Sequence, residues 1–341
     1  MIMNILDERT LEGLIQTVND SLVDAIGLES ATYFLDHLAT KGPSPWEDVV
    51  TYIKEKSSSR VQVSPEKLEV VYSRIREQLS KIMEATEPSL STKIVHSLKY
   101  DLFARLCQRV PLIFMDYGYH SHDPLPLGEH DPNFRYAVQL YHFITSLADI
   151  QDQRVLEVGS GNGGGADYVF RTFSPHSFLG IDICFANVRF SNDHFQREGL
   201  EFRYGDAEQL PLPDGSVDAI LNVESFHLYP NPLQSLQEAH RVLTPGGRLL
   251  IADLFKEQNV MQFRQLATGA SFVIEREENI TRNVSMALPP YIEKLQSLAH
   301  RLPTDLQPFY MKFIGSRSFN KPESNWSGPD LLYSMFVLRK N

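Results

Sequence analysis

The stretch Arg154-Val-Leu-Glu-Val-Gly-Ser-Gly-Asn-Gly-Gly-Gly165 joins a short apolar run to five glycines within seven residues. The apolar residues around Glu157 predict a buried strand, in which this carboxylate is the one charged group. The glycines begin where the strand ends, and they allow the backbone to turn sharply and to approach a ligand closely. Residues 166–170 then predict the start of a helix. A strand, a glycine-rich turn and a helix in this order are typical of the nucleotide-binding start of a doubly wound α/β domain.

Strands and helices alternate around this stretch. The apolar pattern predicts strands at 178–182, 200–204, 217–223 and 248–253, two closing strands at 308–315 and 331–339, and helices at 134–147, 187–197 and 233–243. Such alternation predicts a mainly parallel sheet with right-handed crossover connections. Residues 257–303 lack strand alternation, so we expect a helical insertion over the substrate there.

Two domains are expected, with a boundary near residue 110. Residues 1–110 lack glycine-rich turns and carry apolar residues at helical spacing, which predicts helices at 11–28, 46–56 and 65–82. Residues 111–341 form the α/β domain. Two interpretations of the first domain stay open: it is a helical extension that stabilises the second domain, or a lid or docking element over its site.

Composition restricts the function classes. The formal net charge is −11 and basic residues form no run, which argues against nucleic acid because phosphate binding requires a basic surface. Two cysteines, Cys107 and Cys184, argue against a disulfide framework and fit a reducing cytoplasm. The first residues lack the layout of a signal peptide, and no apolar run reaches the ~18 residues of a membrane span, so we expect a cytoplasmic protein. His120 and His122 lack further ligands at metal spacing, so we expect no metal.

The glycine pattern by itself is ambiguous, because the G-x-G-x-x-G that begins at Gly159 also opens dinucleotide-binding domains. Glu157 argues against that alternative, since a dinucleotide-binding strand usually continues apolar. Two motifs follow downstream: Gly205-Asp-Ala-Glu-Gln-Leu-Pro-Leu-Pro-Asp-Gly215 before one strand, and Pro245-Gly-Gly247 before the next. In this order the motifs resemble class I S-adenosylmethionine-dependent methyltransferases. The resemblance implies a Rossmann-like fold with a seven-stranded sheet, S-adenosylmethionine as cofactor and S-adenosylhomocysteine as product.

Candidate cofactor residues follow the strands, because ligands of such sheets bind at the carboxyl ends of the strands. Asp182 is expected to accept hydrogen bonds from both ribose hydroxyls, and the alternative is a helix N-cap. Asp206 and Ala207 are expected to meet adenine, and the alternative is a simple turn. Glu157 is expected to hold the amino end of the cofactor, and the alternative is a buried structural acid. The full expected set is Glu157, Gly159, Ser160, Gly161, Asp182, Ile183, Asp206, Ala207 and Asn222.

The segment Asn222-Val-Glu-Ser-Phe-His-Leu-Tyr-Pro230 carries a carboxylate and an imidazole three residues apart. At helical spacing Glu224 and His227 would share one face. Methyl transfer to a hydroxyl requires removal of its proton, and histidine is the natural base near neutral pH. A carboxylate beside His227 would fix its tautomer and stabilise the imidazolium, and both Glu224 and Asp253 are candidates for this role. A purely structural histidine is the alternative.

Three features resemble natural-product O-methyltransferases, in particular the O-methyltransferase domains of modular polyketide synthases: Glu224-Ser-x-His-x-Tyr-Pro230, the Tyr117-Gly-Tyr119 sequence, and the long helical start. The resemblance implies that His227 is the base, with Glu224 or Asp253 as its acid, and that Tyr117 and Tyr119 belong to a lid. It also implies a β-hydroxyl or enol of an acyl chain on a carrier protein, with neighbouring synthase domains as partners. A C-methyltransferase of the sterol or quinone type and a non-catalytic domain that binds cofactor or carrier are the alternatives.

Overall fold

The computed structural model describes residues 112–123, 125, 134–302 and 331–341, together with the shorter pieces 12–13, 15–23, 31, 73, 93–94, 97–98, 100–102, 104, 304, 307 and 310–311. The chain divides into two compact units. One comprises Met1–Val110, Cys184–Ala186 and Leu302–Phe309, and the other comprises Pro111–Ile183, Asn187–Arg301 and Tyr310–Asn341. All strands found among the described residues belong to the second unit.

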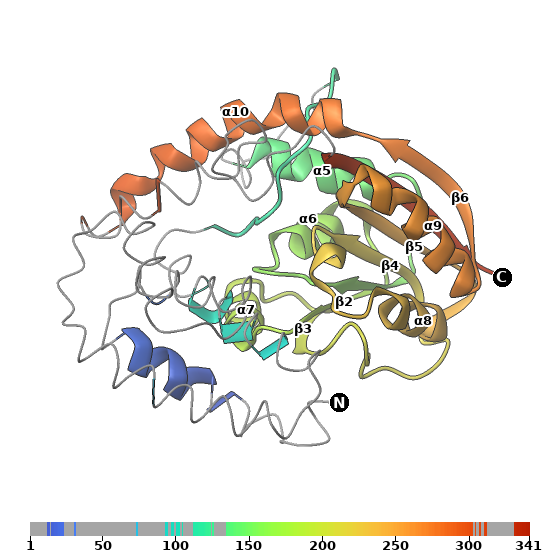
Figure 1. Ribbon diagram of the computed structural model, residues 1–341, viewed down its shortest axis with the longest axis horizontal. Coiled ribbons are helices and arrows are strands. Elements are labelled where there is room, and N and C mark those ends of the chain that lie inside the picture. Colours follow the sequence, from blue (N-terminus) through green and yellow to red (C-terminus); the bar gives the residue numbers. More distant parts are fainter. Residues whose placement is uncertain are drawn as a thin grey trace. The chain divides into compact units, whose positions relative to one another are not determined.

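A seven-stranded sheet forms the centre of the second unit (Figure 1). Its strand order is β3-β2-β1-β4-β5-β7-β6, with the bounds β1 Arg154–Val158, β2 Ser177–Asp182, β3 Leu200–Tyr204, β4 Val217–Val223, β5 Leu243–Lys256, β6 Phe272–Asn279 and β7 Leu331–Lys340. Strands β1 to β5 are parallel, whereas β7 is antiparallel to both β5 and β6. The chain order reverses between β1 and β4, so the carboxyl ends of these strands border the crevice where α/β sheets bind ligands. The predicted mainly parallel sheet of seven strands is confirmed.

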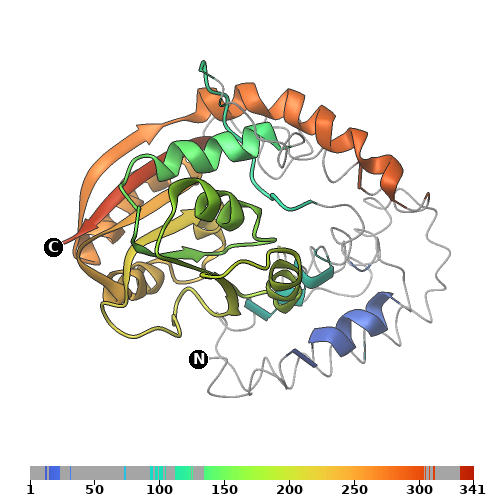
Figure 2. The same cartoon turned by 180° about the vertical axis from the view of Figure 1, so that it is seen from behind.

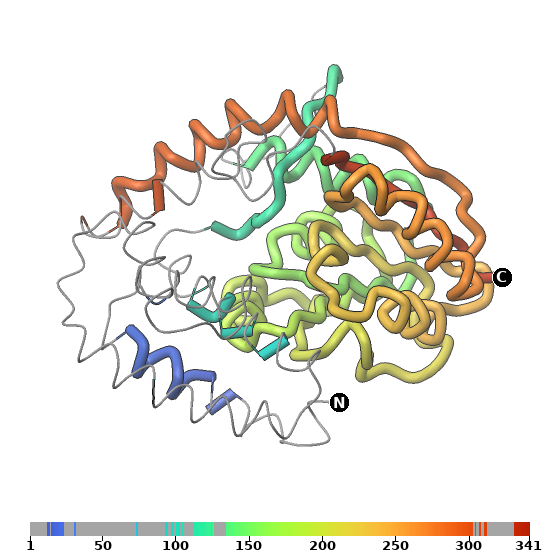
Figure 3. Tube along the Cα trace, in the orientation of Figure 1, coloured from blue at the N-terminus to red at the C-terminus, as the bar shows by residue number. Residues whose placement is uncertain are grey.

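Helices cover both faces of this sheet. Helices α8 (Pro232–Val242) and α9 (Glu257–Gly269) lie in front of it in Figure 1, whereas α5 (Arg135–Thr145) and α6 (Gly164–Phe173) come to the front in Figure 2. The other described helices are α7 (Phe185–His194), α10 (Thr281–Ser297) and the short 3-10 helices η2 (Phe226–Leu228) and η3 (Ala299–Arg301). The tube in Figure 3 shows the chain passing from β6 directly into α10. Within the described part of the chain, no helix has the length and apolar content needed to cross a bilayer.

Four buried phenylalanines fix the short helix η2, which carries His227, to the rest of the unit. Phe263 of α9 packs on Phe336 of β7 with ring centroids 4.4 Å apart. Phe226 of η2 and Phe255 of β5 each meet the Phe263 ring edge-on at 5.2 Å. All four belong to one core cluster. Because burying one such ring contributes about 1.5–3 kcal/mol, this cluster holds η2 firmly at the end of β4.

The region 257–303 contains a strand that the sequence does not predict. It is not an all-helical insertion but forms α9, then the edge strand β6, then α10. Charged residues conceal this strand, because Phe272–Asn279 reads Phe-Val-Ile-Glu-Arg-Glu-Glu-Asn and buries only its first residue. Charges and a register shift, here between Ile274 and Arg276, are typical of an edge strand that must not pair with another chain.

All but one of the other predicted strands are confirmed. The strands predicted up to residue 253 are all present, with β5 longer than expected, and the strand predicted at 331–339 corresponds to β7. The strand predicted at 308–315 is wrong at Tyr310 and Met311, which are helical. The other residues of that range lie outside the described residues.

The described residues of the chain up to residue 104 are helical. A buried side chain connects two of these pieces, because the Asn19 amide donates to Asp101 Oδ2 at 2.8 Å and to the Leu98 carbonyl at 3.1 Å. The predicted helix at 46–56 lies outside the described residues, as does that at 65–82 apart from Ser73, which is helical. The role of this region stays a prediction.

Candidate active site

The glycine loop between β1 and α6 adopts a backbone that side chains would obstruct. Gly159, Gly161 and Gly163 have positive φ values of 78°, 53° and 79°. A Cβ added at Gly159 would lie 2.3 Å from the Cβ of Ser225. The amide of Gly159 also donates to the carbonyl of Ile181 in β2 at 2.7 Å. The loop therefore lies across the carboxyl ends of β1, β2 and β4, at the edge where such sheets bind ligands.

Glu157 of β1 is completely buried. Its Oε1 accepts a hydrogen bond of 2.8 Å from the hydroxyl of Tyr141 in α5, while its Oε2 has no partner among the described residues. Burial raises the pKa of Glu157 to about 8; the bond from Tyr141 opposes this shift, and the nearby Asp182 and Asp116 add to it. A buried carboxyl oxygen without a donor is unfavourable, so this position suits the donor group of a ligand.

Gly165 leaves the space through which the Tyr141 ring reaches Glu157. A Cβ at Gly165 would lie 1.9 Å from Tyr141 Cζ. We expect Gly165→Ala to lower the free energy of unfolding by about 1–3 kcal/mol, because the added methyl displaces a buried ring. The matched control is Gly269→Ala, whose Cβ meets nothing within 4 Å and which we expect to raise stability by about 0.5 kcal/mol. Urea denaturation measures both variants, and equal stabilities would contradict this account of Gly165.

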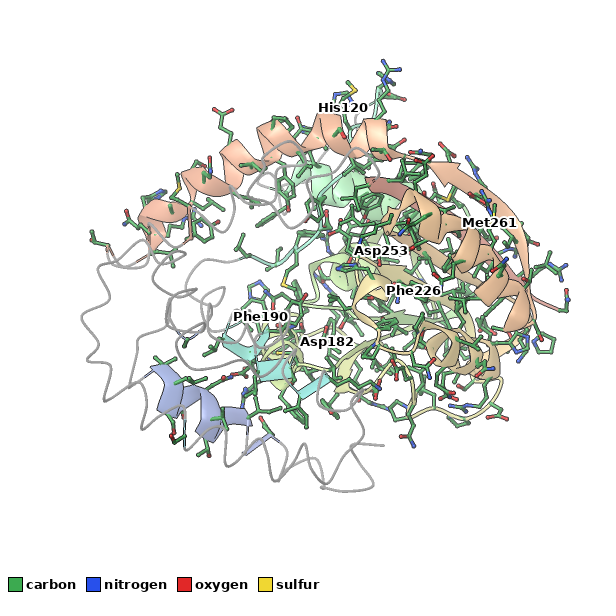
Figure 4. All side chains as sticks on the ribbon, viewed as in Figure 1. His120, Asp182, Phe190, Phe226, Asp253 and Met261 are labelled. Atoms are coloured by element: carbon green, nitrogen blue, oxygen red, sulfur yellow. The ribbon has the colours of Figure 1, made fainter. Side chains whose placement is uncertain are left out.

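Two aspartates at strand ends face different partners. Asp182, labelled in Figure 4, is buried at the end of β2. Its Oδ2 accepts from the Gly161 amide at 2.8 Å and its Oδ1 from the Asn187 side chain at 3.2 Å, so it connects the glycine loop with α7. Asp206 is half-buried after β3, and its Oδ1 accepts from the Glu208 amide at 2.9 Å, which is the turn that the sequence left open as an alternative.

The remaining expected cofactor residues lie at the same edge of the sheet: Ser160 and Asn222 are buried, and Ile183 and Ala207 are half-buried. The Asn222 side-chain amide donates to the Tyr229 hydroxyl at 2.8 Å, while Asn222 Oδ1 has no partner among the described residues. A cavity of about 20 Å³ lies beside Asn222 and Tyr229. It has the size of one water molecule.

His227 and Asp253 form a hydrogen-bonded pair at the carboxyl end of β4, where Asp253 follows the β5 residue that pairs with Val223. The imidazole Nδ1 lies 2.7 Å from Asp253 Oδ1, and the His227 amide donates to Asp253 Oδ2 at 3.0 Å. Asp253, labelled in Figure 4, is completely buried and also accepts from the Leu254 amide at 2.6 Å. The His227 side chain is 17% exposed, which is enough to meet a bound molecule. Two backbone amides thus fix the carboxylate, and the carboxylate fixes the imidazole.

Glu224 lies next to this pair but bonds elsewhere. Its Oε1 accepts hydrogen bonds from the Tyr117 amide at 2.7 Å and from the Tyr333 hydroxyl at 2.8 Å. The expectation that Glu224 and His227 share a helix face is wrong, because η2 begins only at Phe226 and Glu224 has a φ of 53°. Of the two candidate acids, the structure places Asp253 against the imidazole.

Tyr333 of β7 was not predicted from the sequence. It is completely buried, and burial together with the carboxylates of Glu224 and Asp253 raises its pKa well above the usual value. A tyrosine within the apolar run of a strand gives no sign of this contact, which depends on β7 pairing with β5.

The two tyrosines expected in a lid differ from each other in their contacts. Tyr117 is 7% exposed, and its backbone amide bonds to Glu224. The Tyr119 ring stacks on Phe143 of α5 with centroids 4.5 Å apart, so Tyr119 packs on a helix.

Within the described ranges, no three His, Cys, Asp or Glu side chains are grouped to hold a metal ion. His120 and His122 have ring centroids 5.7 Å apart. Cys184 is buried, and Cys107 lies outside the described residues.

Comparison with known proteins places these features in a family. Residues 156–251 match the family described as "Methyltransferase domain". The chain is 36% identical over 223 residues to the fatty-acid O-methyltransferase of Mycolicibacterium smegmatis, which covers 64% of this chain and 81% of that protein. It is 32% identical over 245 residues to the phthiotriol/phenolphthiotriol dimycocerosates methyltransferase of Mycobacterium tuberculosis, which covers 71% of this chain and 90% of that protein.

Two solved structures share the fold at lower identity. The [4+2]-cyclase SpnF has a TM-score of 0.55 at 20% identity, and covers 71% of this chain and 96% of its own. A putative sarcosine dimethylglycine methyltransferase from Galdieria sulphuraria has a TM-score of 0.54 at 18% identity. The match covers 71% of this chain and 98% of that one. Since one of the two is named a cyclase, the fold alone does not identify the reaction, whereas the two curated relatives are both named methyltransferases. The chain belongs to the class I S-adenosylmethionine-dependent methyltransferases.

Proposed function

We propose that this methyltransferase acts on a hydroxyl oxygen, with His227 as the general base and Asp253 as the carboxylate that orients it. The observation that carries the proposal is the 2.7 Å contact between His227 Nδ1 and Asp253 Oδ1 at the carboxyl edge of the sheet. Because the carboxylate accepts at Nδ1, that nitrogen carries the proton of the neutral ring, and Nε2 is the basic nitrogen. As Nε2 takes the hydroxyl proton, buried Asp253 stabilises the imidazolium that forms.

The residues around the glycine loop fit S-adenosylmethionine as the cofactor. When bound, S-adenosylmethionine supplies a methyl group on a positively charged sulfur. Glu157 Oε2, which is buried and lacks a donor, suits the ammonium group of the methionine part. Asp182 suits the ribose hydroxyls, and the left-handed glycines Gly159 and Gly161 leave room for close approach of the backbone.

The pKa of Glu157 predicts that cofactor binding releases a proton near neutral pH. In the unliganded protein this carboxyl, with a pKa of about 8, is mostly protonated at pH 7. A cationic amino group beside it favours the ionised form. We therefore expect the affinity for S-adenosylhomocysteine to rise between about pH 6 and 8, by up to about tenfold per pH unit, and Glu157→Gln to remove this rise.

Calorimetric titration in buffers of different ionisation enthalpies measures the released proton directly. Proton release by the wild type at pH 7 that is absent in Glu157→Gln supports the placement of the amino group. A wild-type protein that releases no proton at pH 7 contradicts it.

The acceptor class is inferred from the relatives and from the pair His227–Asp253. One relative is named for a fatty acid and the other for a triol lipid, so both names indicate long-chain, lipid-like acceptors. A carboxylate has no proton to lose before it accepts a methyl group, whereas an alcohol does. The histidine–aspartate pair therefore favours a hydroxyl over a carboxylate. A β-hydroxyl or enol of a polyketide-like acyl chain, presented on a carrier protein, has this chemistry.

Product analysis tests this proposal. The purified protein is incubated with methyl-deuterated cofactor and with acyl thioesters that carry a β-hydroxyl, and in parallel with the free fatty acid of the same chain length. We expect a methyl ether, identified by its resistance to mild alkaline hydrolysis and by its carbon chemical shift. A methyl ester as the sole product, or a label on carbon, would contradict the proposal.

A further inference from the structure

Glu224 combines an unfavourable backbone with hydrogen bonds to two distant segments. Its left-handed φ of 53° is avoided by side chains with a Cβ. Its donors Tyr117 and Tyr333 lie 107 residues before and 109 residues after it in the chain. Backbone strain of this kind persists where the surrounding structure enforces it, and it often marks a functional position.

One of these donors belongs to residues 112–120, which we call the cover segment and which lies against the glycine loop. The Ile113 carbonyl accepts from the Gly164 amide at 3.0 Å, and the Leu112 carbonyl accepts from the Asn162 side chain at 2.7 Å. The Met115 methyl lies 3.3 Å from the position of a Cβ at Gly161. The cover segment therefore lies over the loop that we assign to the methionine part of the cofactor.

The far end of the cover segment is fixed to helices. The Tyr119 amide donates to the Tyr136 carbonyl at 2.9 Å, and the His120 amide donates to the Asn283 carbonyl at 3.1 Å. The Asn283 side-chain amide in turn donates a hydrogen bond of 2.9 Å to the His120 carbonyl. Between the two fixed ends, the Tyr117 amide is the point at which Glu224 holds the segment to the end of β4.

We propose that Glu224 is a positioning residue that keeps the cover segment closed over the cofactor, and that it does not serve as the acid partner of His227. One carboxylate oxygen, Oε1, joins three parts of the chain: the end of β4, the cover segment and β7. The partner of the imidazole is Asp253. The inference rests on the proposed cofactor site at the glycine loop and does not depend on His227 as base.

The test compares Glu224→Ala with Glu224→Gln, because a glutamine oxygen still accepts hydrogen bonds but carries no charge. Stopped-flow measures the release of S-adenosylhomocysteine, and hydrogen exchange measures the amides of residues 112–120. We expect Glu224→Ala to accelerate release by about 10- to 100-fold, since two hydrogen bonds to a charged acceptor are lost, and to increase exchange in the cover segment. Glu224→Gln should stay within about fivefold of the wild type in both measurements. Glu198→Gln, at an exposed position, is the matched control and should change neither.

Tyr333→Phe tests the inference from the second donor and keeps it testable if Glu224→Ala does not fold. It removes one hydroxyl donor, and we expect release to accelerate by about 3- to 10-fold. His227→Ala should leave release unchanged, so a failure of the proposed base and a failure of this inference are seen in different measurements. The inference is overturned if Glu224→Gln loses turnover as severely as Glu224→Ala while release and amide exchange stay at wild-type values. In that case Glu224 acts through its charge on the reacting groups.

Discussion

Replacement of His227 by alanine is expected to lower kcat by about 10²- to 10⁴-fold, the usual contribution of a general base. The affinity for S-adenosylhomocysteine should stay within about twofold of the wild type, because the proposed cofactor contacts come from Glu157, the glycine loop and Asp182. The side chain lies at the site edge on η2, so its removal leaves the phenylalanine cluster below it intact. His300→Ala is the control, since this histidine is exposed in η3 and bonds to the Ser297 carbonyl.

A double-mutant cycle with Asp253→Asn tests whether the two residues act as a unit. The single Asp253→Asn variant presents an amide donor or a weaker acceptor to Nδ1, which disturbs the tautomer that makes Nε2 basic. We expect the double variant to be no slower than His227→Ala, because residues that act together are not additive. Additive losses would contradict the assignment of Asp253 as the orienting carboxylate.

The second large effect is expected for Asp182→Ala, which should weaken S-adenosylhomocysteine binding by at least about 100-fold. Two hydroxyl donors of the ribose lose a charged acceptor, and each such hydrogen bond contributes about 1.5–3 kcal/mol. The variant also removes the 2.8 Å bond that Asp182 accepts from the Gly161 amide, which loosens the glycine loop.

Calorimetry with Asp193→Ala as control checks this result. Asp193 is an exposed aspartate of the neighbouring helix α7, so it matches the charge change without touching the loop. Equal affinities of Asp182→Ala and the wild type would remove Asp182 from the cofactor site and leave it only the structural contact with the Gly161 amide.

How much of the fold could be predicted depended on how completely each strand is buried. Strand β4 has six of its seven residues buried, so its apolar run is visible in the sequence. Strand β6 buries one residue of eight and carries four consecutive charged residues, so its composition resembles that of an exposed helix. Its strand conformation comes from pairing with β7, a contact distant in sequence.

The candidate site residues could likewise be predicted where they follow buried, apolar strands. Residues directly after apolar strands could be predicted as candidates, because the carboxyl ends of parallel strands meet at one edge. The acid that contacts His227 could be narrowed only to Glu224 or Asp253. The choice depends on the pairing of Val223 with Ala252, which brings Asp253 beside the residues that follow β4, and on the left-handed turn at Glu224. Neither the register nor the turn is encoded in the helical spacing of the two residues.

The proposed base is tested most directly by measuring how the His227→Ala defect depends on the acidity of the acceptor. Matched thioesters with a β-hydroxyl and with a β-keto group, whose enol is far more acidic, are methylated by the wild type and by His227→Ala. If His227 removes the proton, the variant should lose about 10²- to 10⁴-fold with the alcohol and much less with the enol, which ionises without help. An equal loss with both acceptors would show that His227 positions the substrate and does not act as the base.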